Sequence, residues 1–339
     1  MNALVLRASV VVLVALLAGA ANAVVIETVP VGNPGNAGEL SGSGAGGYGP
    51  DAIVGAVSYT YNIGKYEVTA GQYTEFLNKV AATDPYGLYN AYMWSNTYGC
   101  KIQRSGTSGG YTYSVASDYA NRPVNYVSWG DTARFANWLH NGQPAGPQGA
   151  GTTETGAYTL NGALTDAELM AVTRNADWKW AITSEDEWYK AAYHKNDGAS
   201  GNYFDYPTSN DGVPGRDLND VSGNNANYYG TPFPIDSPYY TTIVGEFQNS
   251  DSPYGTFDQC GNMWEWNEAV IGLYRGVRGG SFLLNSGNYL HASNRNYNYP
   301  TIEYYNFGFR VSEVPEPGTL ALLAWGGIGV LRRRRGLGR

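Results

Sequence analysis

Four stretches of the chain space their apolar residues as an amphipathic helix does, directly after a polar pair that suits a helix start. In the first stretch, Thr69 and Gln72 form a capping box, in which two side chains satisfy free backbone N–H groups. Apolar side chains then follow at helical spacing from Tyr73 to Val80. The other boxes begin at Ser128, Thr165 and Ser184. The pattern predicts four short helices, each beginning after one of these residues.

Strand patterns are shorter and more scattered. Residues 24–31 predict a first strand, and alternation of apolar and polar residues predicts another over 56–68. Residues 32–50 are rich in Gly, Asn and Ser and predict a flexible loop. Beyond residue 200 the helical spacing is lost, and 241–247 and 275–282 resemble short strands between turns. Few short helices with small antiparallel sheets and many loops indicate the α+β class.

The N-terminus has the three parts of a secretory signal. Arg7 supplies the positive charge, residues 8–18 are apolar, and Ala21-Asn22-Ala23 is a small-residue cleavage sequence. The pattern predicts that residues 1–23 form a signal peptide that is cleaved after Ala23.

The C-terminus carries a second targeting pattern over residues 313–339. The tripeptide Pro315-Glu316-Pro317 precedes a short charge-free apolar stretch, 319–331. An arginine cluster follows: Arg332, Arg333, Arg334 and Arg335. This order resembles the PEP-CTERM signal of Gram-negative bacteria, which implies an exosortase-type sorting protease as partner and a short transmembrane segment that anchors the protein transiently. A plain tail anchor is the alternative. Both place the central domain outside the cytoplasm, at the cell envelope, surface or extracellular matrix.

Composition sharpens the picture of the central domain. Six of the 21 basic residues but only two of the 29 acidic residues lie in the two targeting ends, which leaves 15 basic against 27 acidic residues and a net charge of −12. Nucleic acid and anionic membrane surfaces are therefore excluded as partners, whereas cations suit the domain. The 29 tyrosines and 45 glycines favour aromatic packing among loops. Of two cysteines, Cys100 and Cys260, the sequence leaves open whether they pair.

Several segments in order resemble the formylglycine-generating enzyme (sulfatase-modifying factor) family, and the resemblance covers residues 52–312, after a strand and loop at 24–51. It implies a variant of the C-type lectin fold. The segments are Ile63 to Thr69, Arg122 to Trp129, Ile182 to Trp188, Ala226 to Gly230, Gly255 to Trp266, Arg278 to Phe282 and Gly308 to Arg310.

The resemblance argues for the fold and against the family's reaction. The enzymes hold copper(I) with two cysteines shortly after the Arg-Gly-Gly-Ser segment, because thiolates suit that soft ion. In this chain Ser281 matches a family serine, but the cysteine positions are Leu284 and Tyr289. We therefore expect neither copper nor formylglycine-generating activity. The iron-dependent branch of the fold is equally unexpected, because the three histidines lie far apart in sequence.

The resemblance also implies two calcium sites, since oxygen ligands stand at the mapped positions and calcium takes six to eight oxygens. The first set is Asn227, Tyr228, Asp236 and Pro238, and the second is Asp258, Gly261, Met263 and Glu265.

The segment 285–305 is rich in Asn and Tyr and lies where the family's cleft is lined. It also resembles the variable regions of diversity-generating-retroelement proteins, and such residues contact sugars or proteins well. The expected contact residues are Trp264, Ser281, Asn285, Asn288, Tyr289, Asn294, Asn296 and Tyr297. These features favour a calcium-stabilised surface module that binds an exopolysaccharide or a surface protein. An enzyme with divergent chemistry on envelope components and a purely structural matrix protein remain the alternatives.

Overall fold

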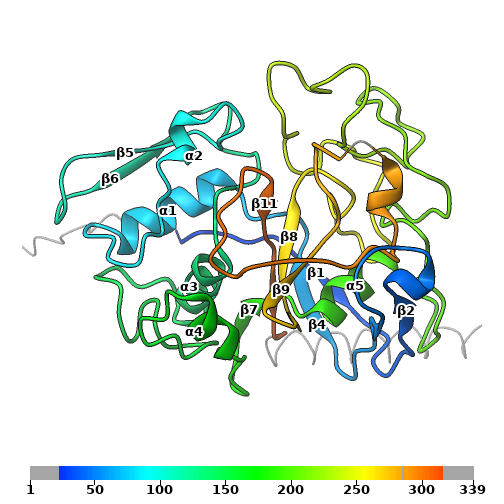
Figure 1. Cartoon of the computed structure of the whole chain (residues 1–339), viewed down its shortest axis with the longest axis horizontal. Helices are drawn as coiled ribbons and strands as arrows, with labels where there is room; N and C mark the ends of the chain where they lie inside the picture. Colours follow the sequence, from blue (N-terminus) through cyan, green and yellow to red (C-terminus); the bar gives the residue numbers. More distant parts are fainter. Residues whose placement is uncertain (1–22, 285, 316–339) are drawn as a thin grey trace, which may run out of the picture.

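The computed structural model describes residues 23–284 and 286–315. One four-stranded antiparallel sheet has the order β1 (Thr28–Val31), β4 (Tyr61–Gly64), β12 (Val311–Glu313) and β7 (Trp180–Ile182). The first and last of its strands along the chain, β1 and β12, lie on either side of β4. Figure 1 labels β1, β4 and β7 of this sheet.

A second four-stranded sheet has the order β10 (Asn296–Asn298), β9 (Tyr274–Arg278), β8 (Trp264–Ile271) and β11 (Phe307–Gly308). The β8–β9 hairpin is antiparallel, with a break in register between Trp266 and Val270, whereas β11 pairs with β8 in parallel. Two separate hairpins complete the strands: β2 (Glu39–Ser41) with β3 (Ala52–Val54), and β5 (Ile102–Ser105) with β6 (Thr112–Val115).

All four predicted capping boxes are present, and a helix begins after each one. The helices are α1 (Ala70–Val80), α3 (Trp129–His140), α4 (Asp166–Ala171) and α5 (Glu185–Tyr193). At α1, for example, Gln72 N–H donates to Thr69 Oγ1 at 3.2 Å, and Thr69 N–H donates back to Gln72 Oε1 at 2.8 Å. Three short elements were not predicted: α2 (Tyr92–Ser95), η1 (Ser43–Ala45) and η2 (Gly287–Leu290).

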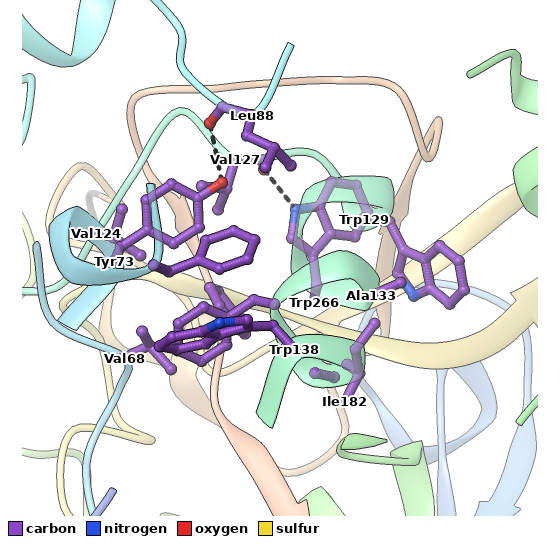
Figure 2. Packing of buried hydrophobic residues seen from close by; sticks show 14 of the residues in the cluster. Val68, Tyr73, Leu88, Val124, Val127, Trp129, Ala133, Trp138, Ile182 and Trp266 are labelled. Atoms are coloured by element: carbon purple, nitrogen blue, oxygen red, sulfur yellow. Dashed lines mark hydrogen bonds between the residues drawn. The ribbon is translucent and has the colours of Figure 1, made fainter. Parts of the chain in front are cut away.

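The main core lies between α1, α3 and the second sheet, and it is unusually aromatic (Figure 2). The rings of Phe76 and Trp138 lie 5.2 Å apart, and buried polar atoms on the rings are satisfied by carbonyl groups. Tyr73 OH donates to the Leu88 carbonyl at 2.9 Å, and Trp266 Nε1–H donates to the Val127 carbonyl at 3.0 Å. The tryptophans therefore fix loops to the core as well as fill it.

Some strand predictions were wrong in extent. Residues 24–27 and 56–60 form no strand, and 241–247 contain none, because turns and side-chain contacts take up their backbone groups. Conversely, residues 32–50 contain β2 and η1, and Asn36 and Ser41 within them are buried. The longest strand, β8, begins at Trp264, one of the expected contact residues.

The expectation of a transmembrane segment is corrected here: within residues 23–284 and 286–315, no helix is long and apolar enough to cross a membrane. The stretch that prompted the expectation, 319–331, lies outside the described residues, as do the other predicted tail residues beyond Pro315 and the signal peptide up to residue 22.

The two cysteines do not pair. Cys100 and Cys260 are both free and buried. Burial raises the pKa of Cys100 to about 11 and holds the pKa of Cys260 well above its usual range. Both thiols are therefore packing residues and poor nucleophiles.

Candidate functional site

The residues expected to line the family's cleft begin just after β9 in the chain. Ser281 is fully buried, and its Oγ accepts a hydrogen bond from Asn306 Nδ2 at 3.0 Å. Leu284 is half-buried against the main core, and its carbonyl accepts from the Tyr229 N–H at 2.9 Å. Tyr289 is exposed on η2. The positions matched to the cysteine pair thus hold an aliphatic packing residue and a solvent-facing phenol.

Six rings from three segments of the chain follow one another in contact, beginning at Tyr229, whose N–H bonds the Leu284 carbonyl. The spacings between successive ring centroids are 4.6, 5.6, 4.5, 5.2 and 4.7 Å. The rings at the two ends are each 45% exposed, whereas the four between them are half-buried. We call this set the aromatic run: Tyr229, Phe233, Tyr240, Tyr98, Tyr305 and Tyr304. Phe282, which directly follows Ser281, packs against Tyr98 and Tyr240 and so ties the run to the predicted cleft.

A second group of four tyrosines includes Tyr274 on β9 and Tyr297 on β10. Tyr297 stacks on Tyr48 with a centroid separation of 6.2 Å and packs on Tyr274 at 4.9 Å. Tyr274 in turn packs on Tyr299 at 4.6 Å. We call these four residues the tyrosine row. It joins the N-terminal part of the chain to the edge strand β10.

The structure separates the predicted contact residues. Trp264 is buried in the main core and Ser281 is fully buried after β9, so neither presents a surface. Asn288 and Tyr289 are exposed on η2, and Asn294 Nδ2 donates to the Asn288 carbonyl at 2.5 Å. The two on β10 belong to or adjoin the tyrosine row: Asn296 and Tyr297. Asn285 lies outside the described residues.

Charged residues within 286–305 are all partnered. Arg295 is buried against Glu185 at 2.8 Å, and His291 Nε2 lies 3.5 Å from Asp205 Oδ1. The Glu303 carboxyl accepts from Asn90 Nδ2, and burial raises its pKa to about 8. The segment therefore presents hydroxyl, amide and ring surface to solvent, without a free charge among its described residues.

Three of the residues mapped to the first calcium site are engaged elsewhere or exposed. Asp236 pairs with Arg122, with Oδ2 and Nη1 2.7 Å apart. The Tyr228 carbonyl accepts from Arg216 Nε at 2.5 Å, and Pro238 is exposed. A calcium ion at this position would have to compete with these contacts for its oxygen ligands.

Asn227 behaves differently. Its side chain is buried, its Nδ2 donates to Asn262 Oδ1 at 3.1 Å, and its Oδ1 has no partner among the described residues. The Thr242 N–H donates to the same Asn262 oxygen at 3.1 Å, and Thr242 Oγ1 is likewise buried without a partner in the described chain. Buried polar atoms are normally satisfied, so these two orphaned oxygens fit a bound cation or an ordered water.

The second mapped site fits calcium poorly. Both oxygens of the fully buried Glu265 are held by Arg310, through Nε at 2.6 Å and Nη2 at 2.7 Å, and Trp188 Nε1–H donates to one of them at 2.8 Å. These three hydrogen bonds leave the carboxylate only about one of its four lone-pair sites for a cation. No three His, Cys, Asp or Glu side chains converge as a metal centre within the described part of the chain.

Two further carboxyl groups lie near that ion pair. Burial, with repulsion from Asp258 and Glu265, holds the pKa of Glu67 well above its usual range, and Glu67 accepts from Asn262 Nδ2 and Met263 N–H. Burial raises the pKa of Asp258 to about 6, and its Oδ2 accepts from the Gly245 N–H at 2.6 Å. Gly261, the remaining predicted ligand, is buried in the same loop.

Comparison with known families places this architecture. Residues 41–314 match the model of the sulfatase-modifying factor enzyme 1-like domain. The chain belongs to this family. The domain's short helices, small sheets and long loops are accordingly the formylglycine-generating-enzyme-like variant of the C-type lectin fold. Residues 313–335 match the PEP-CTERM protein-sorting motif, which supports export and sorting at the cell envelope.

Solved structures of similar shape exist at low sequence identity. CarF is 19% identical with a TM-score of 0.49 over 86% of this chain and 99% of its own. PvdO from Pseudomonas aeruginosa is 19% identical with a TM-score of 0.48, over 85% and 94%. Treponema denticola variable protein 1 is 18% identical, also with a TM-score of 0.48, over 85% and 95%. No curated protein sequence matches the chain.

A buried charged cluster of this sulfatase-modifying factor enzyme 1-like domain was missed by sequence reasoning. The Glu185 carboxylate binds two buried arginines, Arg278 at 2.6 Å and Arg295 at 2.8 Å. Arg278 belongs to the Arg-Gly-Gly-Ser motif, so the pairing could have been sought among the motif residues.

Proposed function

We propose that this exported protein is a non-enzymatic binding module that holds a neutral polysaccharide of the cell surface through the aromatic run. The observation that carries the proposal is the aromatic run itself, which Phe282 ties to Ser281 and whose Tyr229 N–H bonds the Leu284 carbonyl. Leu284 stands at a position that the sequence resemblance matches to a metal-binding cysteine of the enzymes. A hydrocarbon side chain there supports binding without oxidation.

The chemistry of the run favours sugars. Aromatic rings pack against the C–H faces of sugar rings, and tyrosine hydroxyls add hydrogen bonds at their edges. Tyr229 and Tyr304 leave nearly half of their surface exposed at opposite ends, which suits an extended ligand. The paired charges of the neighbouring segment 286–305 disfavour a charged polymer, because a free ionic group would find no counter-charge there.

The test is affinity electrophoresis of the purified protein in gels that contain neutral polysaccharides, after a glycan array has chosen them. Tyr229→Ala with Tyr304→Ala should abolish the retardation. Tyr48→Ala is the matched control, because Tyr48 is 50% exposed and belongs to the separate tyrosine row. Loss of binding in the Tyr48 variant alone, or binding only to peptides, would refute the proposal. Stoichiometric copper or iron in the purified protein would replace it with an enzymatic function.

We also infer that calcium, if it stabilises the domain, binds at Asn227 and Thr242 rather than at Glu265. The two orphaned oxygens support the first position, and the Arg310 clamp on Glu265 weighs against the second. A chelator should then lower the Tm of the natural protein and leave that of Asn227→Ala unchanged, because removal of the amide oxygen removes the ligand. An equal chelator effect on both proteins would refute this assignment.

A further inference from the structure

A polar pocket lies around Glu268, away from the aromatic run. Glu268 is in β8, within the register break between Trp266 and Val270 that turns the strand away from a regular ladder. Such bulges commonly re-aim a side chain. Here two cavities share Glu268 and Val270 as lining residues, one of about 170 Å³ and one of about 350 Å³.

The carboxylate of Glu268 is fixed at one oxygen only. Its Oε1 accepts from Arg174 Nε at 2.8 Å and from the Tyr158 hydroxyl. No donor within the described residues reaches Oε2, and the side chain is 17% exposed. The group is thus positioned by two neighbours and retains one acceptor oxygen for a ligand.

The smaller cavity also contains an incompletely bonded arginine. Arg275 is buried, lies over the Trp129 ring at 3.9 Å, and donates through Nη1 and Nη2 to carbonyl groups that include that of Glu268. Its Nε–H has no partner in the described part of the chain. A buried donor of this kind is costly to leave unsatisfied, so the cavity wall combines an available donor with an available acceptor.

The formal charges around the smaller cavity cancel. Arg174 bridges Glu268 to Glu187, whose two oxygens it holds at 2.8 and 2.9 Å, and Arg275 supplies the second positive charge. Two carboxylates against two guanidinium groups leave no net attraction for an ion. A hydroxyl group fits better, because it can donate to Glu268 Oε2 and accept from an N–H at the same time.

From these contacts we infer that the pocket around Glu268 is a second ligand site, which binds one neutral sugar unit or a polyol of similar size through its hydroxyl groups. The smaller cavity far exceeds the roughly 30 Å³ share of a single water and falls below the roughly 300–1,000 Å³ typical of drug-sized ligands. The site is independent of the proposed function, since none of its lining residues belongs to the aromatic run.

The rim of the pocket offers a variant that leaves the charged network intact. Val270 lines both cavities and is 58% exposed, so Val270→Trp should cover the entrance without disturbing the core. Leu273, on the same hairpin, is 70% exposed, and Leu273→Trp is the matched control. Urea unfolding of both variants checks that each is folded.

The experiment is an NMR titration of the purified protein with free glucose, galactose, mannose and N-acetylglucosamine. At least one of these sugars should bind the natural protein with a Kd in the roughly millimolar range. Val270→Trp should bind it about tenfold more weakly, and Leu273→Trp should bind it with the same Kd. Glu268→Gln should also weaken binding of that sugar, whereas Tyr229→Ala with Tyr304→Ala should leave it unchanged. Absence of binding by all four sugars, equal binding by the two tryptophan variants, or preference for glucuronate or glucosamine would overturn the inference.

Discussion

Replacement of Asp258 by asparagine should stabilise the protein, although it removes a buried hydrogen-bonded carboxylate. Asp258, Glu67 and Glu265 lie in one buried region and share a single guanidinium, that of Arg310. The backbone of Asp258 has φ +62°, which asparagine adopts as readily as aspartate. An amide oxygen can also keep the hydrogen bond from the Gly245 N–H.

The magnitude follows from the pKa of Asp258. Burial raises it from 3.8 to about 6, so the folded protein holds the proton more tightly than the unfolded chain. Ionisation of Asp258 therefore leaves the free energy of unfolding unchanged below the pKa of the unfolded chain. Above that pKa it lowers the free energy of unfolding increasingly, and the loss levels off at about 3 kcal/mol from about pH 6 upward. Loss of a charge-assisted hydrogen bond offsets about 1 kcal/mol of this, which leaves a net gain of about 2 kcal/mol.

The assay is urea unfolding in the presence of a chelator at about pH 8 and about pH 4. The loss of stability from ionisation of Asp258 is complete at the first pH and nearly absent at the second. The midpoint for Asp258→Asn should rise at the higher pH with an unchanged m-value, and match the natural protein at the lower pH. A variant less stable at both values would refute the reasoning. A calcium-dependent stability that Asp258→Asn abolishes would refute it too, and would restore the second predicted calcium site.

Three other outcomes follow from single contacts. Glu185→Gln leaves two buried arginines without their carboxylate and should cost about 3–5 kcal/mol in urea unfolding, with a lowered Tm as an independent check. Cys100 and Cys260 should resist a thiol reagent in the folded protein and react fully in urea; rapid labelling of the native protein would contradict their burial. Gly261→Ala places a methyl group 2.3 Å from the Asn227 carbonyl oxygen at φ +82° and should cost about 3 kcal/mol or more, whereas an unchanged urea midpoint would show that the loop shifts freely.

The helix starts could be predicted from the sequence because a capping box is a local device. The Ser184 hydroxyl and the Glu187 carboxylate satisfy each other's backbone groups within one turn, so neighbouring residues suffice to identify it. Strand β8 could not be predicted in the same way. Its residues from Trp264 to Asn267 are buried on both faces, so no alternation of polar and apolar positions marks it.

The candidate sites likewise include features that the local sequence reveals and features that only the fold brings together. That Leu284 and Tyr289 are not cysteines can be read from the sequence alone, and the expectation that the family's copper reaction is absent rests on that alignment. The aromatic run could not be foreseen, since Tyr98, Tyr240 and Tyr305 meet only through the fold. Glu265 shows the opposite error: an oxygen ligand in sequence becomes the partner of Arg310, 45 residues away.

The placement of β12 bears on how the sorting tail can be handled. This strand is hydrogen-bonded to β4 on one side and β7 on the other, and the ladder extends to the Val314 N–H, which donates to the Lys179 carbonyl at 2.8 Å. The Pro-Glu-Pro tripeptide begins one residue later. A protease that cuts at this tripeptide therefore acts directly beside the folded domain. Tension on an uncut tail would pull on a central strand, and it would stress the hydrogen bonds to β4 and β7 together instead of detaching an edge strand.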